Sequence, residues 1–142
     1  MTVPIPRGIR NCNPGNIDFS QANNWQGQLP YDPAIESRFC RFDCAENGIR
    51  ALGKLLQVYF NKYARTTVRA IITPYAPGNE NDTAAYIATV AQRCGLGPDD
   101  QIPSITDPVV LGVLITSIIA QENADYAYPD AVLAEGLRRA RV

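Results

Sequence analysis

The sequence contains no histidine, and this absence removes several familiar kinds of catalytic site. Serine–histidine triads, histidine-rich zinc sites and the imidazole that shuttles protons near neutral pH all need this residue. Acid–base chemistry must therefore come from carboxylates, tyrosines, cysteines or lysines. We expect no bound metal and no cofactor.

A surplus of basic residues and a long apolar run are also missing. The 13 Lys and Arg residues stand against 14 Asp and Glu residues, which gives a formal net charge of -1. A phosphate backbone needs a broad positive field, so nucleic acid is not an expected partner. The first ten residues lack the apolar core of a signal peptide, and the longest apolar stretch is too short to span a bilayer. We therefore expect cytosolic synthesis, no signal peptide and no membrane span.

The residues that are present predict one mainly helical domain over residues 1–142. With 46% hydrophobic and 19% charged residues, the chain can bury a real core. Residues 1–40 are rich in Asn, Gly, Pro and Gln, which favours loops, and residues 38–43 alternate polar with apolar as in a short strand. The expected fold therefore has a short N-terminal β/loop region followed by helices.

Apolar residues at steps of three and four predict the helices. They cover residues 46–63, 68–72, roughly 82–94 and 109–121, and a last helix follows residue 130. The segment 109–119 is apolar almost all round, so we expect it to be the most buried helix and to pack against 46–63. The expected N-terminal caps are Thr67, Asn81 or Asp82, Asp107 and Asp130, and the expected C-terminal cap is Gly95.

Four cysteines, Cys12, Cys40, Cys44 and Cys94, lack the spacing of a metal finger. We interpret them as free thiols. A disulfide from Cys12 to Cys40 or Cys44 stays open for a protein that works outside the reducing cytosol.

Glycoside cleavage needs a carboxylic acid that stays protonated near neutral pH, which an apolar setting favours. Glu122 ends the most apolar segment of the chain, at a helix C-terminus whose dipole disfavours negative charge. The alternative is an ordinary solvated residue of a last helical turn. The other glutamates have simpler explanations, since Glu46 and Glu135 fit exposed helix positions and Glu36 a polar loop.

Glu80 and Asn81 form the second candidate pair, at the junction of a Pro-Gly loop and a helix start. A carboxylate there can orient water, and an amide can bind an acetamido sugar. Near the N-terminus, Trp25 and Asn16 bring together the single tryptophan and an amide-rich turn. Taken by themselves, they are better explained by turn chemistry and one core aromatic, although a sugar site also uses such groups.

Several ordered motifs carry a resemblance to a known family over nearly the whole chain. The chain resembles a family of phage virion and prophage proteins that is often labelled structural protein or lysozyme-like. The order of its motifs is similar to that of bacterial glucosaminidases and lytic transglycosylases, except that the catalytic-glutamate helix comes last, as in a circular permutation. The motifs are residues 7–17, Trp25-x-Gly27, Phe39-x-x-Phe42, residues 48–51, Tyr75-Ala76-Pro77, Glu80-Asn81-Asp82-Thr83, Tyr86-Ile87 and Glu122-Asn123.

The resemblance implies a lysozyme-like helical fold and a peptidoglycan substrate. It places Glu122 as the acid, with Tyr75, Glu80, Asn81 and Tyr86 along the glycan cleft. The chain departs from the family pattern at three positions. Cys12 stands where Asn is expected, Tyr75 where Trp or a similar aromatic is expected, and Ala124 where Gly follows Glu-Asn.

These observations favour a muramidase or lytic transglycosylase of phage type that acts on peptidoglycan in the bacterial periplasm or cell wall. The rival hypothesis is a non-catalytic virion or wall-binding component, with other virion proteins as partners, and Ala124 keeps that hypothesis open. A toxin delivered into a competitor's envelope is a third interpretation. The expected locations are the phage virion or the host cytoplasm.

Overall fold

The computed structural model describes residues 4–142. Residues 1–3, part of the expected domain and of the segment expected to lack a signal peptide, lie outside the described residues. The described chain is mainly helical, as predicted. Its elements are α1 (Arg7–Arg10), α2 (Ala45–Lys62), α3 (Val68–Ile72), the 3-10 turn η1 (Thr73–Tyr75), α4 (Glu80–Cys94), α5 (Pro108–Glu122) and α6 (Asp130–Arg141).

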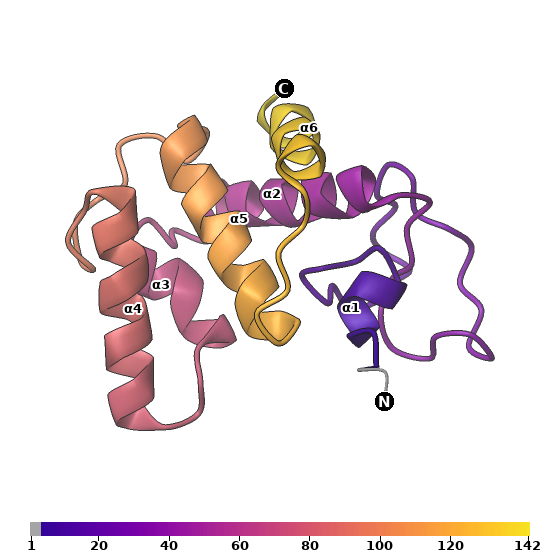
Figure 1. Ribbon diagram of the computed structural model, residues 1–142. Helices are drawn as coiled ribbons and strands as arrows, with labels where there is room; N and C mark the ends of the chain where they lie inside the picture. Colours follow the sequence, from indigo (N-terminus) through magenta and orange to yellow (C-terminus); the bar gives the residue numbers. More distant parts are fainter. Residues whose placement is uncertain (1–3) are drawn as a thin grey trace.

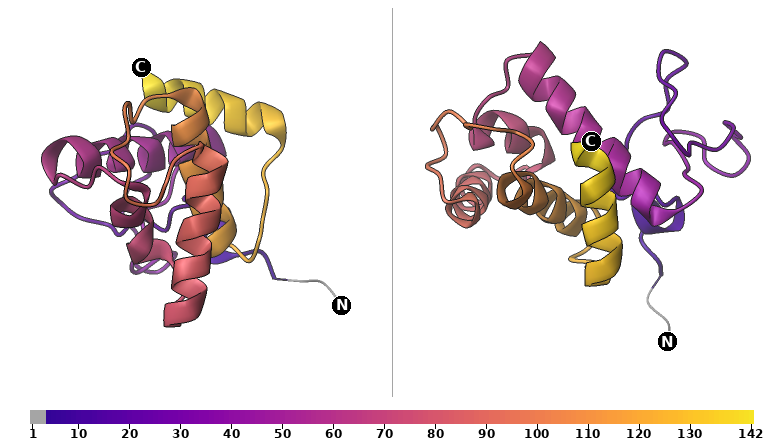
Figure 2. Two further views of the ribbon diagram at one scale, coloured as in Figure 1. Left: turned by 90° about the vertical axis from the view of Figure 1, so that its left-hand side faces the viewer. Right: turned by 90° about the horizontal axis from the view of Figure 1, so that it is seen from above.

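Helix α5 occupies the centre of the molecule. Figure 1 shows α3 and α4 on one side of α5 and the N-terminal loop region, residues 4–44, on the other. Seen from above, α5 lies between α4 and α6, and the loop region lies at the opposite side of the molecule from α4 (Figure 2). The chain therefore divides into a loop-rich part and a helical part that meet near the C-terminal end of α5.

The sequence explains why α5 is central. Asp107 caps its N-terminus by accepting hydrogen bonds from the backbone of Val109 and Val110, each at 3.0 Å. The residues that follow in α5 are apolar on nearly every side of the helix, and Leu111, Leu114 and their neighbours are buried. Val109 is the exception, at 60% exposed. The prediction of a buried helix here is confirmed.

Helix α2 packs against α5 as expected, but its more extensive contact is with α6. Two glycines allow this close approach. A Cβ atom on Gly136 would lie 2.6 Å from Ile49, and one on Gly53 would lie 2.5 Å from the Cβ of Ala140. The apolar period of α2 predicted a buried face, but it could not indicate which helix covers that face.

Two predicted helix caps are wrong by one to three residues. The side chain of Asn79, not that of Asn81 or Asp82, accepts the backbone hydrogen bonds at the start of α4. Asp130 is the first residue of α6, and the preceding Pro129 occupies the cap position without a side-chain hydrogen bond. The predicted caps Thr67, Asp107 and Gly95 are confirmed.

The expected strand at residues 38–43 forms only two isolated bridges, Asp18 with Phe39 and Gln28 with Phe42. Its backbone hydrogen bonds go to three different segments rather than to one neighbour. Cys40 donates to the carbonyl of Ile17, Phe42 to that of Asn11, and Asp43 to that of Gly27. A continuous ladder needs one partner strand, and no segment supplies it within residues 4–142.

The four cysteines are free thiols, as interpreted from the sequence, and Cys40 and Cys94 are buried. Among residues 4–142, no helix is both long enough and apolar enough to cross a bilayer. The same residues contain no group of three or more His, Cys, Asp or Glu side chains placed to hold a metal ion.

Candidate active site

A cleft of about 510 Å³ lies where the N-terminal loop region meets the helices. The end of α5, the turn η1 and one face of α2 supply one wall, and the loop region supplies the other. Four of the seven residues singled out in the sequence line it. The lining residues are Gly15, Asn16, Ile17, Asp18, Ser20, Asn23, Trp25, Arg38, Phe39, Leu55, Tyr59, Pro74, Tyr75 and Glu122.

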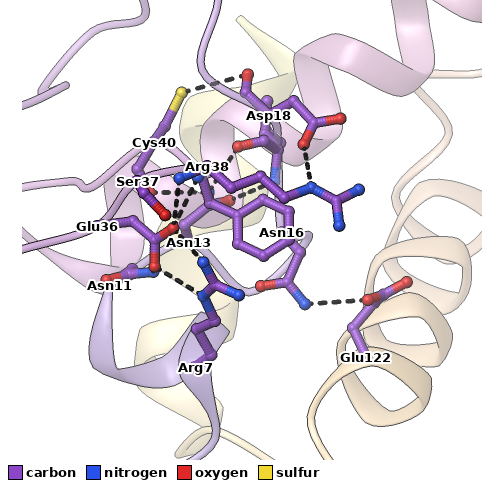
Figure 3. A network of polar contacts seen from close by, with 12 residues as sticks. Arg7, Asn11, Asn13, Asn16, Asp18, Glu36, Ser37, Arg38, Cys40 and Glu122 are labelled. Atoms are coloured by element: carbon purple, nitrogen blue, oxygen red, sulfur yellow. Dashed lines mark hydrogen bonds and ion pairs between the residues drawn. The ribbon is translucent and has the colours of Figure 1, made fainter. Parts of the chain in front are cut away.

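Glu122 enters this cleft from the last residue of α5. The side-chain amide of Asn16 donates a hydrogen bond of 2.9 Å to its Oε2 atom, across 106 residues of sequence (Figure 3). Within residues 4–142 its Oε1 atom has no hydrogen-bond partner. One oxygen is therefore held in place, while the other remains available to a molecule in the cleft.

The asparagine-rich turn at residues 13–17 positions Asn16. Asn13 is fully buried, and its amide donates to the carbonyls of Ile17 and Cys40 while its oxygen accepts from the Ile17 backbone. Asn16 adopts a left-handed backbone with φ of 48°, which asparagine tolerates better than most residues. The turn is therefore rigid, and it aims the Asn16 amide at the end of α5.

The short helix α1 presses against the same asparagines. A Cβ atom on Gly8 would lie 2.5 Å from Oδ1 of Asn123 and 2.9 Å from Oδ1 of Asn16. The Asn123 amide in turn donates to the carbonyls of Pro14 and Ile119. Gly8 and Asn123 thus tie α1, the turn and the end of α5 into one packed unit beneath Glu122.

Two tyrosines lie near the Glu122 carboxylate. Burial raises the pKa of Tyr75 well above its ordinary value, and the charges of Tyr59 and Glu122 add to the effect. Burial also raises the pKa of Tyr86 to about 12, with a further contribution from Glu122. Tyr75 lines the cleft, whereas the hydroxyl of Tyr86 donates to the Ser117 carbonyl at 2.9 Å and Tyr86 is not among the lining residues.

Glu36 does not fit the sequence interpretation of a residue in a polar loop, because it is 3% exposed. Arg7 holds it with two hydrogen bonds of 2.8 and 2.6 Å, and the Asn11 amide and the backbone of Arg38 and Phe39 also donate to it. The hydrogen bond from Arg7 and these other donors lower the pKa of Glu36 far below its ordinary value. It is a structural anion that anchors α1 to the loop beneath the cleft.

Asp18 and Arg38 line the cleft and were not singled out in the sequence. They form an ion pair with 2.9 Å between Arg38 Nε and Asp18 Oδ1, visible in Figure 3. The bridge between Asp18 and Phe39 brings the two segments together. The alternation at residues 38–43 was the only sequence signal for this contact, and it does not specify a partner.

The structure places the second candidate pair elsewhere. Glu80 and Asn81 are exposed in the first turn of α4, and neither lines the cleft. Trp25 is half-buried in the cleft wall, where it packs against the small apolar cluster that contains Phe42. The cleft therefore joins Glu122 with Asn16, Trp25 and Tyr75, and separates this group from Glu80 and Asn81.

Two departures from the family pattern fall on left-handed backbone. Cys12 has φ of 51° and Ala124 has φ of 52°. Asparagine and glycine tolerate this conformation more readily than other residues, which accounts physically for the Asn and Gly expected there. Ala124 lies two residues beyond Glu122, so the strained position is separated from the candidate acid by Asn123 alone.

The fold and the cleft together define a mainly helical protein that presents one carboxylate at a helix end to a cleft with aromatic and amide walls. No protein-family model matches the sequence. Protein P5 of Pseudoalteromonas phage PM2 is 35% identical over 126 residues, which cover 86% of this chain and 74% of Protein P5. The chain belongs to the family of Protein P5, and the expected association with bacteriophage proteins is thereby confirmed.

Proposed function

We propose that the protein cleaves the glycan strand of bacterial peptidoglycan, as a lysozyme-like enzyme of phage type, with Glu122 as general acid. The observation that carries this proposal is the Glu122 carboxylate at the end of a buried helix, fixed by Asn16 and open to a cleft. The kinship with a phage protein fits action from a virion, or from the host cytoplasm, on the cell wall.

The cleft walls have the chemistry that a glycan requires. Trp25 and Tyr75 offer aromatic faces for the apolar side of a sugar ring, and Asn23 offers an amide for its polar groups. The acid's task is to deliver a proton to the glycosidic oxygen as the bond to the leaving sugar breaks. The free Oε1 atom of Glu122 is the position from which this proton is delivered.

Two routes follow that protonation. In hydrolysis a second carboxylate activates water or attacks the sugar, and Asp18 is the other carboxylate among the described residues that line the cleft. In the lytic transglycosylase route a hydroxyl of the muramyl sugar attacks the anomeric carbon of the same sugar and gives its proton to the Glu122 carboxylate, so no second carboxylate is needed. Asp18 is engaged by Arg38, so its role depends on whether that ion pair opens.

The experiment is incubation of the purified protein with peptidoglycan sacculi, followed by mass analysis of the released fragments. Glycan cleavage predicts soluble disaccharide units. Reducing ends identify hydrolysis, and anhydro ends identify transglycosylation. Release of no fragments contradicts the proposal.

The rival function is a non-catalytic virion or wall-binding component, favoured by the left-handed Ala124 beside Glu122. That rival predicts binding to intact sacculi without release of fragments. A pull-down with sacculi, run beside the digestion, separates the two.

A further inference from the structure

Arg38 is the only cationic side chain among the residues that line the cleft in the described part of the chain. Its side chain is 66% exposed, although its neighbours hold it in place. Nε is bound to Asp18, and the guanidinium lies 4.7 Å from the centre of the Phe39 ring. The group is therefore oriented before any ligand arrives.

The terminal nitrogens of this guanidinium have no partner within residues 4–142. An arginine fork can serve two carboxylates, one at Nε and one at its terminal N–H groups, because its five donors lie in one plane. The remaining donors are therefore suited to an anionic oxygen pair on a molecule in the cleft. A neutral sugar chain offers no such group.

We propose that Arg38 recognises a carboxylate carried by the muramyl residue of the glycan and so selects peptidoglycan over neutral chitin-like chains. This inference rests on the proposed function, since it names the substrate feature that the same cleft recognises. The carboxylate has two sources. It is the lactyl group in strands without peptides, or an acid of the stem peptide in strands that carry them.

The test measures binding by calorimetry, in a Glu122→Gln background so that the ligands persist. The ligands are chitohexaose, peptide-free glycan strands and glycan strands with stem peptides. Arg38→Gln is expected to lower the preference for carboxylate-bearing strands over chitohexaose roughly tenfold, with a smaller loss at high salt because screening weakens charge pairing. Arg38→Lys is expected to retain part of the preference.

Arg69→Gln is the matched control. Arg69, on α3 and outside the cleft, forms an exposed ion pair with Asp99 through two hydrogen bonds, 2.7 Å from Nε to Oδ1 and 3.1 Å from a terminal nitrogen to Oδ2. This variant removes one charge and one Arg–Asp pair and is expected to leave the preference intact.

Each outcome decides the inference. Loss of preference with peptide-free strands identifies the lactyl carboxylate, and loss only with peptide-bearing strands identifies the stem peptide. Equal losses on all three ligands mean that Arg38 acts only by holding Asp18, which overturns the inference. Absence of binding to every ligand contradicts it too.

The inference and the proposed function can fail separately. A parent protein that digests sacculi while the preference is independent of Arg38 refutes the inference alone. Binding that depends on Arg38, in a protein that releases nothing from sacculi, refutes glycan cleavage alone.

Discussion

The N-terminal loop region and the helical part are held together by different forces. In residues 45–142 a cluster of apolar side chains fills the space between the helices. In residues 4–44 the apolar cluster is small, centred on Ile17, Cys40 and Phe42, and much of the order comes from the buried polar groups Asn13 and Glu36.

The cleft lies at the junction of these two parts, and each part supplies what it is suited to supply. The apolar core fixes the end of α5, and thus the backbone of Glu122. The polar region presents donors and charges, such as Asn16 and Arg38, on loops that buried hydrogen bonds make rigid. A site on well-anchored loops beside a rigid scaffold is a common arrangement for binding and catalysis.

The largest stability effect is expected in the helical part. Leu114 is fully buried at the centre of α5. Leu114→Ala should lower the free energy of unfolding by about 3 kcal/mol, because it leaves a cavity that the packed helices cannot close. Val109→Ala, on the exposed first turn of the same helix, should change it by less than about 0.5 kcal/mol. Urea unfolding at pH 7 measures both, and equal effects would mean that α5 is not the centre of the core.

The next largest effect is expected in the N-terminal loop region, where the free energy of unfolding should depend on pH. Glu36→Gln should cost about 2 kcal/mol at pH 7, because it breaks the pair with Arg7 and leaves buried donors poorly matched. The pKa of Glu36 is lowered in the folded state, principally by that pair. The contribution of Glu36 to the free energy of unfolding is therefore complete above the ordinary glutamate pKa of about 4.3. It is lost as the pH falls below about 4.3 toward the lowered pKa of the folded state.

Unfolding of the parent and the Glu36→Gln variant, compared from pH 7 to pH 3, measures this dependence. The gap between them should narrow as the pH falls below about 4.3. Leu114→Ala provides the contrast, since its loss involves no titrating group and should not narrow in the same way. A gap for Glu36→Gln that stays constant across the range would show that the buried carboxylate is not a charged anchor.

A smaller effect on stability, of opposite sign, is expected at Ala124, just beyond the end of α5. Ala124→Gly should raise the free energy of unfolding by about 1 kcal/mol, because alanine is strained at its φ of 52° and glycine is not. Thermal unfolding measures the change. Ala84→Gly, at an exposed position inside α4, should lower the free energy of unfolding by a similar amount. A loss of stability at position 124 would contradict the strain argument.

The helical part was largely predictable, because its information is local. The apolar period of α2, the Asp107-Pro108 start of α5 and the Gly95 end of α4 each specify their own element. The cap at Asn79 was predicted wrongly because Asn79, Asn81 and Asp82 can each cap a helix, and only the loop geometry selects one of them.

The polar region was less predictable, because its order comes from contacts between distant residues. Nothing local distinguishes Glu36 from a solvated loop residue, since its partners Arg7 and Asn11 lie 29 and 25 positions away. Asp18 and Arg38 could not be predicted as a pair for the same reason, because they lie 20 positions apart in the sequence. Glu122 could be singled out because both of its features, the apolar helix and the position at the helix end, are visible in one continuous segment of the sequence.

The most direct test of glycan cleavage by this cleft is the rate at which Glu122→Gln digests sacculi. Glutamine keeps the shape and can still accept the hydrogen bond from Asn16, but it has no carboxyl proton to transfer. The rate should fall roughly a hundredfold or more with little change in unfolding temperature, whereas Glu80→Gln, exposed on α4, should digest at the parental rate. Digestion by Glu122→Gln at the parental rate would contradict the account.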